Sequence, residues 1–443
     1  MSRSEFNRQS QIMQDLLEFE SNRIGRETGF VERRSKVSAA LFVKMLVLGL
    51  LEKGDASLNQ LVQVGEDLGV CVSESGLAQR MTEAASRLLQ QLFQTLLAQQ
   101  QTQAGLEPKL LSGFAGVHIL DSTQISLPKR MREMFGGSGG SASVAGAKLQ
   151  VSYEYLSGQL QAIELTRGTL SDQASGLVLT VAQAGSLSLF DLGYFKQSTL
   201  VGLAQAGAFF LSRLNTQTHL YRQANDPTPL DLLAYMRRQT ADCGEVALCL
   251  GESARLRLRL VFQTLPPEQV AERRRRARRA AQKKGRTCSQ RHLALLAWNF
   301  FITNVPAARW TPPQVVLVYR LRWQIELLFK LWKSEAKFDT VRCQRPERFV
   351  CLLYARLLGL LLFHGLIAPY RTLGPAELSL TKAFHVFQRA LPALLALMAG
   401  RGACLDGLLA RLTDKLQRFA LCSTRLKSPS TRQRLSVGGV QCA

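Results

Sequence analysis

The sequence lacks the cysteine patterns and the leader that many exported or metal-binding proteins carry. Its cysteines include no C-x-x-C pair of the kind that holds zinc or forms a redox dithiol. The amino terminus, MSRSEFNRQSQ, has no apolar core, which a secretory signal requires. We therefore expect free thiols in a reducing compartment and a cytoplasmic protein.

Acidic residues are scarce relative to basic ones. The 33 Asp and Glu stand against 56 Lys and Arg, which gives a formal net charge of +23. A positive field of this size favours a polyanionic partner, because phosphates release condensed counterions on binding. A merely basic enzyme or a ribosome-associated protein would have the same balance. With 46% hydrophobic residues, the 443-residue chain can bury a large core and predicts two to four domains.

One apolar run approaches the length of a membrane span. It covers Cys351 to Ala368, and Arg356 and His364 interrupt it. No second run of this kind accompanies it, and a lone span would be unusual in so basic a chain. We predict a buried core helix and no membrane partner.

Helix-forming residues dominate the chain from about Ser38 to Leu97. The apolar repeats in LFVKMLVLGLLE and LAQRMTEAASRLLQQLFQTLL are typical of amphipathic helices, and Ser73 or Ser75 could cap the second. Residues 57–81 have the length of a helix-turn-helix, but helices that only pack on each other fit equally well. We predict a helical DNA-binding domain over residues 1–110.

Two short apolar strands each lead into an aspartate. GVHILDST ends its strand at Asp121, and SLSLFDLGYF ends its strand at Asp191. Between them lie a glycine- and serine-rich loop at 136–146, a hairpin of alternating residues up to Thr166, and Asp172, which could cap a helix to about Ala184. If the two strands are neighbours, both aspartates meet at the carboxyl edge of the sheet, where α/β proteins bind ligands.

The alternation of strands and helices breaks over residues 214–292. This segment contains possible strands at Glu245–Leu250 and Leu256–Phe262, then the basic run RRRRARRAAQKKGR. Afterwards LALLAWNFFITNV predicts a buried strand, and Thr311 before a Pro-Pro pair predicts a helix start. We interpret 214–292 as an insertion in a catalytic domain that spans 111–345.

The segment YRLRWQIELLFKLWK, residues 319–333, carries the most informative pattern. On a helix its polar side chains would share one face, and these are Tyr319, Arg322, Glu326, Lys330 and Lys333. The other side is an apolar stripe of Leu321, Ile325, Leu328, Phe329 and Trp332. Such a helix buries one side and presents a carboxylate framed by cations. Ordinary ion pairs of Glu326 with Arg322 or Lys330 would explain the same pattern.

The spacing Y-x-x-R-x-x-x-E-x-x-x-x-x-x-K resembles the signature of bacterial insertion-sequence DDE transposases, in the family typified by insertion sequence four. DST at 121–123, DLGYF at 191–195 and TN at 303–304 resemble other motifs of that family, with Ser122 where a glycine is common. The resemblance covers roughly Gly113 to Asp339 and is weak in the amino-terminal region. It implies an α/β fold with an RNase H-like mixed-sheet catalytic core, a β-rich insertion and helical regions at both ends.

The resemblance also implies the roles of individual residues. Asp121, Asp191 and Glu326 would hold two Mg²⁺ ions, with Mn²⁺ as a substitute, since hard cations prefer carboxylate oxygens. Phosphates at the transposon end would be gripped by Tyr319, Arg322 and Lys333, with Lys330 as a further point charge. The partners would be double-stranded DNA, as transposon ends and as target, and a second copy in a homodimer. The site of action would be the bacterial nucleoid.

Other candidates rest on weaker signals. Trp323 lies near the polar face and could stack on an unpaired base, whereas Trp298 and Trp310 fit a core better. His118 and His292 have no matching ligand cluster and fit structural roles. The basic run has no single helical stripe, so it is either a solvated loop or helix face or a set of phosphate contacts. Its arginines are Arg273, Arg274, Arg275, Arg276, Arg278 and Arg279.

Two other functions remain open on the sequence alone. A non-catalytic DNA-binding descendant would lack metal-dependent cleavage, and an RNase H-like repair nuclease would cleave without joining strands to a target. The region 346–443 predicts helices, a candidate dimerisation surface and a frayed tail from about Ser423.

Overall fold

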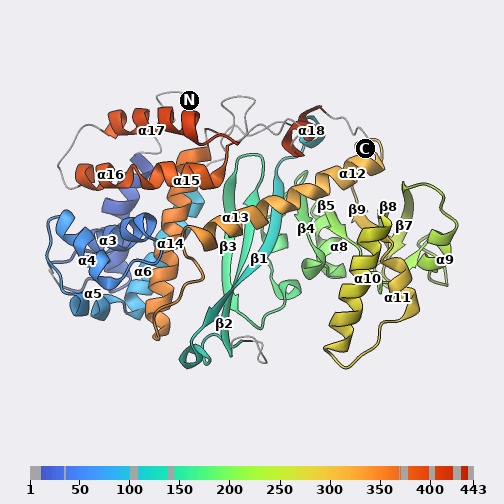
Figure 1. Cartoon of the computed structure of the whole chain (residues 1–443), viewed down its shortest axis with the longest axis horizontal. Helices are drawn as coiled ribbons and strands as arrows, with labels where there is room; N and C mark the ends of the chain where they lie inside the picture. Colours follow the sequence, from blue (N-terminus) through green and yellow to red (C-terminus); the bar gives the residue numbers. More distant parts are fainter. Residues whose placement is uncertain are drawn as a thin grey trace. The chain divides into compact units, whose positions relative to one another are not determined.

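The computed structural model describes residues 11–33, 36–99, 108–137, 144–368, 370, 378–398, 405–422 and 431–437. The chain forms two compact units. Unit 1 comprises Met1–Leu106, Ser122–Leu170 and Ile325–Thr424, and unit 2 comprises Glu107–Asp121, Ser171–Gln324 and Arg425–Ala443. Strand β1 (Val117–Leu127) and helix α13 (Trp323–Ser334), both labelled in Figure 1, each begin in unit 2 and end in unit 1.

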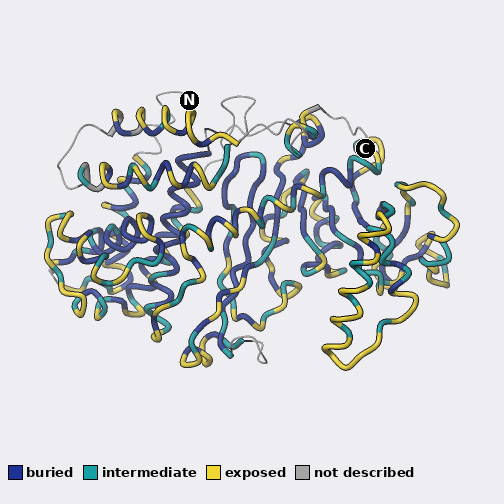
Figure 2. Tube along the Cα trace, in the orientation of Figure 1, coloured by how far each residue is buried: buried dark blue, intermediate teal, exposed yellow. Residues whose placement is uncertain are grey.

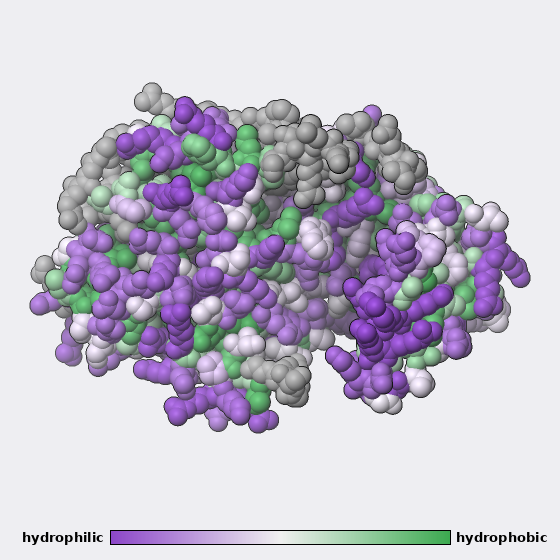
Figure 3. Space-filling view, viewed as in Figure 1, coloured by the Kyte–Doolittle hydropathy of each residue, from purple (hydrophilic) through white to green (hydrophobic). Residues whose placement is uncertain are grey.

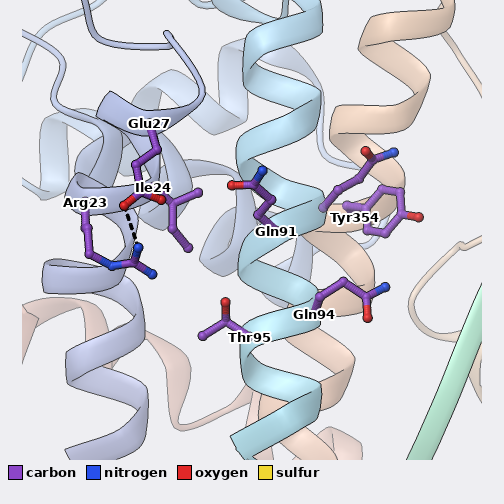
Figure 4. Close-up of a pocket in the computed structure, with 8 residues that line it drawn as sticks. Arg23, Ile24, Glu27, Gln91, Gln94, Thr95 and Tyr354 are labelled. Atoms are coloured by element: carbon purple, nitrogen blue, oxygen red, sulfur yellow. Dashed lines mark hydrogen bonds and ion pairs between the residues drawn. The ribbon is translucent and has the colours of Figure 1, made fainter.

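The amino-terminal part of unit 1 is helical, as predicted. Its elements are η1 (Leu16–Glu20), α2 (Ser21–Glu27), α3 (Ala39–Glu52), α4 (Leu58–Asp67), α5 (Glu74–Arg80) and α6 (Glu83–Gln99). The predicted second helix is divided in two: Ser73 caps α5 by accepting from the Gly76 amide, and Thr82 accepts from the Ala85 amide at the start of α6. A polar pocket in this unit is lined by residues of α2, α6 and α14 (Pro346–Ile367), as Figure 4 shows, and it contains none of the predicted site residues.

The predicted hairpin is present in unit 1. Strands β2 (Ala145–Glu154) and β3 (Gln159–Arg167) pair antiparallel, after the short η3 (Lys129–Met131). Both faces of β2 are covered, including Gln150 and Ser152 on the face that alternation assigns to solvent. Glu154 stays satisfied because its carboxylate accepts the Leu156 and Ser157 amides in the turn. The predicted 136–146 loop lies mostly outside the described residues.

The carboxyl-terminal part of unit 1 supplies its core helix, α14 (Pro346–Ile367), together with α15 (Leu380–Gln388), α16 (Leu391–Met398) and α17 (Leu405–Phe419). By length and composition α14 could cross a membrane, yet 94% of its most apolar window is buried (Figure 2), as the sequence predicted for a core helix. Arg356 is buried with it and donates from Nε to the Gly54 carbonyl.

Unit 2 contains the sheet from the first part of β1 to the edge strand β6. The described strands follow the order β3-β2-β1-β4-β5-β9-β8-β7-β6. Strand β1 pairs parallel with β4 (Leu187–Phe190), and β4 pairs parallel with β5 (Phe209–Arg213). The antiparallel strands beyond β5 are β9 (Trp298–Thr303), β8 (Leu256–Thr264), β7 (Cys243–Leu250) and β6 (Leu220–Tyr221). This mixed sheet with its β-rich insertion confirms the predicted α/β fold class.

Several predicted boundaries in unit 2 were wrong. The helix expected from Asp172 is reduced to two short turns, η4 (Asp172–Ala174) and α7 (Leu177–Thr180), and Asp172 does not cap α7. Helix α8 (Gln197–Gln205) forms as expected. The segment predicted as one buried strand is α11 (Gln290–Leu295) followed by β9, because Ser289 caps a helix there. The remaining insertion helices are α9 (Leu232–Arg237) and α10 (Pro267–Gln282).

Helix α12 (Pro312–Tyr319) begins at the predicted place, with a capping box between Thr311 and Gln314. It leads through a 3₁₀ turn, η6 (Arg320–Arg322), into α13. The tail is not frayed throughout, since α18 (Thr431–Val437) is a helix whose Leu435 is fully buried in unit 2.

Candidate active site

The two predicted aspartates lie side by side. In the parallel pairing of β1 and β4, Leu120 is the register partner of Phe190, and each aspartate is the next residue along its strand. Neighbouring strands are separated by about 4.8 Å, so both carboxylates belong to one edge of the pairing. Only β4 ends there: β1 continues to Leu127, which corrects the prediction that its strand stops at Asp121.

Arg322 holds the carboxylate of Asp121. Its Nη1 donates to Asp121 Oδ2 at 3.0 Å, and each side chain is only 19% exposed. The pair joins residues far apart in sequence, so Arg322 is more than the member of a surface ion pair within its own helix. The 3₁₀ turn η6, at which α12 gives way to α13, sets the position of this guanidinium.

Tyr319 does not lie on one continuous helix with Glu326, as the prediction of a shared polar face required. The regular helix ends at Tyr319, and the turn that follows changes the rotation per residue. Its ring packs on Phe301 of β9 with centroids 4.8 Å apart. Burial and the charge of Asp191 raise the pKa of Tyr319 to about 12, although Arg213 and Arg322 oppose the shift. The hydroxyl is therefore neutral, and its oxygen is buried.

The predicted apolar stripe is present, since Leu321 of η6 and the other four stripe residues, on α13, are all buried. Glu326 is half-buried and lies one helical turn beyond Arg322, Lys330 is exposed, and Lys333 is partly exposed. Trp323 presents 58% of its surface to solvent.

The two other tryptophans and the two histidines were predicted to fit structural roles. Of these four residues, Trp310 and His118 are buried. Trp310 is fully buried and donates from Nε1 to the Leu110 carbonyl, as expected of a core residue. Trp298 is half-buried, and its ring centroid lies 6.4 Å from that of Phe300. His118 is buried in β1, and His292 is exposed on α11.

Within the described residues, no three His, Cys, Asp or Glu side chains are gathered into a preformed metal-binding group. Asp121 is paired with Arg322. The chemistry of the donors nevertheless fits a hard divalent ion, since two carboxylates come from adjacent residues of paired strands.

Two residues near Asp191, Asp172 and Arg213, were not predicted as site residues. A Cβ at Gly193 would lie 2.9 Å from Asp191 Oδ1 and 3.0 Å from Asp172 Oδ2, so both carboxylates approach the same glycine. The Gly193 amide donates to Asp191 Oδ1 at 2.7 Å. Arg213 ends β5, the next strand after β4, and the strand-end rule that identified the aspartates would have found it. Asp172 has no comparable signal in the sequence.

The basic run forms most of α10, with its arginines facing in two ways. Arg273 donates to Asn299 and Arg274 donates to the Leu293 carbonyl, so these two point toward the body of unit 2. Arg275 and Arg276 pair with Glu272, and Arg278 and Arg279 are exposed. The run is therefore an ordered helix, and its charges are not equivalent.

Known proteins resemble this chain over most of its length. The family model described as "Transposase DDE domain" matches residues 112–362. The transposase of insertion sequence element IS1151 from Clostridium perfringens is 30% identical over 390 residues, covering 82% of each chain. That of IS231B from Bacillus thuringiensis subsp. berliner is 28% identical, covering 89% of this chain and 87% of the relative. A piggyBac transposase synaptic complex with hairpin DNA aligns at a TM-score of 0.49 and 10% identity over 96% of this chain and 87% of that chain. With its family domain matched over more than half its length, the chain belongs to the DDE transposase family.

Proposed function

We propose that this transposase cuts DNA at the ends of an insertion sequence and joins them to a target, with Asp121, Asp191 and Glu326 as catalytic carboxylates. The observation that carries the proposal is the register of β1 and β4, which makes Asp121 and Asp191 neighbours. Glu326 follows one turn after Arg322, the residue that donates to Asp121. The family implies use of a divalent metal, and these three residues have the oxygen donors that such an ion prefers.

Two Mg²⁺ ions, with Mn²⁺ as a substitute, would be held by these carboxylates, activating the attacking oxygen and neutralising the leaving oxygen. Asp191 is oriented for this role by the Gly193 amide, which fixes one of its oxygens. Asp121 is positioned by its ion pair with Arg322. Arg322 would then be close to the reacting phosphate, and its planar fork suits phosphate oxygens.

The remaining contacts would place the DNA. Tyr319 keeps its proton, and its buried hydroxyl beside Arg322 would support that arginine. Lys330 and Lys333 follow along α13 and would contact backbone phosphates. The exposed indole of Trp323 would stack on a base next to the cut. The exposed arginines of α10 would add contacts that do not read sequence.

We also propose how the chain is organised for this work. Residues 1–110 would bind DNA, 111–345 would carry the chemistry, and 346–443 would contribute to a homodimer formed on the DNA. The substrates would be double-stranded transposon ends and target DNA in the bacterial cytoplasm, at the nucleoid, with no membrane partner. The net charge of +23 supports such a polyanionic substrate.

Alanine variants of the three carboxylates test the proposal. Each should lose cleavage and strand joining of an end duplex while retaining DNA binding, because a carboxylate contributes no attraction to phosphate. Glu268→Ala, an exposed acid at the start of α10, is the matched control and should cleave normally. Mg²⁺ and Mn²⁺ should support turnover, whereas Ca²⁺ should support assembly with little cleavage.

The assay also separates the alternatives. Robust cleavage by any of the three variants would refute its catalytic role. Metal-dependent cleavage without joining to a target would identify a nuclease, and binding without either reaction would identify a non-catalytic descendant.

A further inference from the structure

Two arginines of unit 2 share one neutral hydrogen-bond acceptor. Arg213 Nη2 donates to Asn299 Oδ1 at 2.9 Å, and Arg273 Nη2 donates to the same oxygen at 2.7 Å. The three residues come from β5, α10 and β9, so distant parts of the sequence converge on this point. All three side chains are half-buried.

The arrangement brings two positive charges together on an oxygen that has no formal charge. An amide oxygen carries only a partial charge and cannot neutralise two guanidinium groups. Burial and the nearby charge of Arg213 both lower the pKa of Arg273, which is the signature of cations held close to each other. A dianionic or monoanionic oxygen group placed across the two forks would relieve this repulsion.

The pair adjoins the candidate active site. Arg213 is the register partner of Phe301, and Asn299 lies two residues before Phe301, so all three share one face of the sheet. The ring of Tyr319 packs on Phe301. Phe190 is the register partner of Ser212, so Asp191 and Arg213 are the next residues along the neighbouring strands β4 and β5.

Helix α10 is held firmly enough to present Arg273 at a fixed position. Val270 is its buried residue, and Arg274 donates to the Leu293 carbonyl. The opposite side of α10 is strongly hydrophilic, as the purple surface over this helix shows (Figure 3). A polyanion drawn to that exposed side would therefore find Arg273 at its inner edge.

We propose that Arg213 and Arg273, spaced by Asn299, form a binding site for one backbone phosphate of DNA, separate from the phosphate held by Arg322. The inference rests on the proposed function, because it takes DNA as the substrate of the adjoining carboxylates. It assigns to the insertion a defined task, which is to hold the strand that runs from the cut toward α10. Arg273 thereby has a role different from that of the exposed arginines of the run, which would contact DNA at no defined phosphate.

The test uses the full chain and an end duplex whose inverted repeat is read from the DNA flanking the gene. Arg273→Gln should weaken binding about tenfold and flatten the slope of log affinity against log salt by about 0.9, the effect expected when one phosphate is no longer neutralised. Arg237→Gln removes the same charge from an exposed position on α9 and should do neither. In a second experiment, single phosphates of the duplex are replaced one at a time by neutral methylphosphonates. At one position the replacement should weaken binding of the wild type but cause no further loss of affinity in Arg273→Gln. At matched ionic strength, excess inorganic phosphate should not lower the DNA affinity of the wild type to that of Arg273→Gln.

Asn299→Asp separates binding from a structural tether. A carboxylate would pair with both arginines, so the melting temperature should be unchanged or higher while DNA binding falls as in Arg273→Gln. A tether role predicts the reverse, with normal DNA binding for Asn299→Asp and a lower melting temperature for Arg273→Gln. That result would overturn the proposal. So would a scan in which every methylphosphonate weakens DNA binding as much in Arg273→Gln as in the wild type. These readouts measure binding, so failure of metal-dependent cleavage by the wild type would count against the proposed function alone.

Discussion

Replacing Asp121 with alanine removes the carboxylate to which Arg322 donates. The pair has a 3.0 Å N–O separation, and each side chain keeps 19% of its surface exposed. Fully exposed pairs contribute roughly 0.2–1 kcal/mol, and breaking a buried pair costs roughly 3–5 kcal/mol. This partly buried pair lies between those limits, so Asp121→Ala should lower the free energy of unfolding by about 1–3 kcal/mol.

A double-mutant cycle isolates the interaction itself. Unfolding in guanidinium chloride would be measured for wild type, Asp121→Ala, Arg322→Ala and the double variant. We expect a coupling energy of about 1–2 kcal/mol, because removing both partners avoids leaving one buried charge alone. The matched control is Arg87 with Glu83, an exposed i,i+4 pair on α6 with an N–O distance of 2.9 Å, for which about 0.3–0.5 kcal/mol is expected.

The same cycle connects the ion pair to catalysis. Asp121→Ala should abolish DNA cleavage, and Arg322→Ala should impair assembly on cut ends more than nonspecific binding. A coupling energy no larger than that of the control pair would refute the reasoning, because Arg322 would then be no more than a surface charge near Asp121.

Gly54→Ala should destabilise the chain by about 1–3 kcal/mol in denaturant unfolding, because its Cβ would lie 2.4 Å from the Ala336 backbone; unchanged stability would contradict this close packing. Cys351 should react with iodoacetamide far more slowly than the exposed cysteines at pH 8, because burial raises its pKa to about 12 and keeps the unreactive thiol form below that pH; equal labelling rates without denaturant would show that α14 is open. Neutralising Arg278 and Arg279 together should flatten the salt dependence of binding on end and random duplexes alike, by up to about 0.9 for each phosphate that is no longer neutralised; weakening confined to end sequences would mean that α10 reads bases.

Elements with a strong local signal were predictable. The helix start at Thr311 was recognisable from a Pro pair and a capping residue, and it forms the expected capping box. The β2–β3 hairpin followed from alternation on both sides of a short turn. The predictions failed where local signals competed: Ser289 starts a helix inside an apolar run that reads as one strand, and Asp172 turns toward Gly193 instead of capping α7. Periodicity cannot resolve the first case, because short apolar runs fit both helix and strand.

By itself the sequence determined the class of the protein and its leading candidate residues. The aspartates follow buried strands, and the glutamate lies on an amphipathic helix, so local hydrophobic periods were enough to assign Asp121, Asp191 and Glu326 to positions in an α/β fold. Only the tertiary structure decided which charges meet. Arg322 donates to Asp121, and Arg213 and Arg273 share Asn299. These contacts join residues that are far apart in the chain, and they depend on sheet register and on the turn between α12 and α13, neither of which any local pattern encodes.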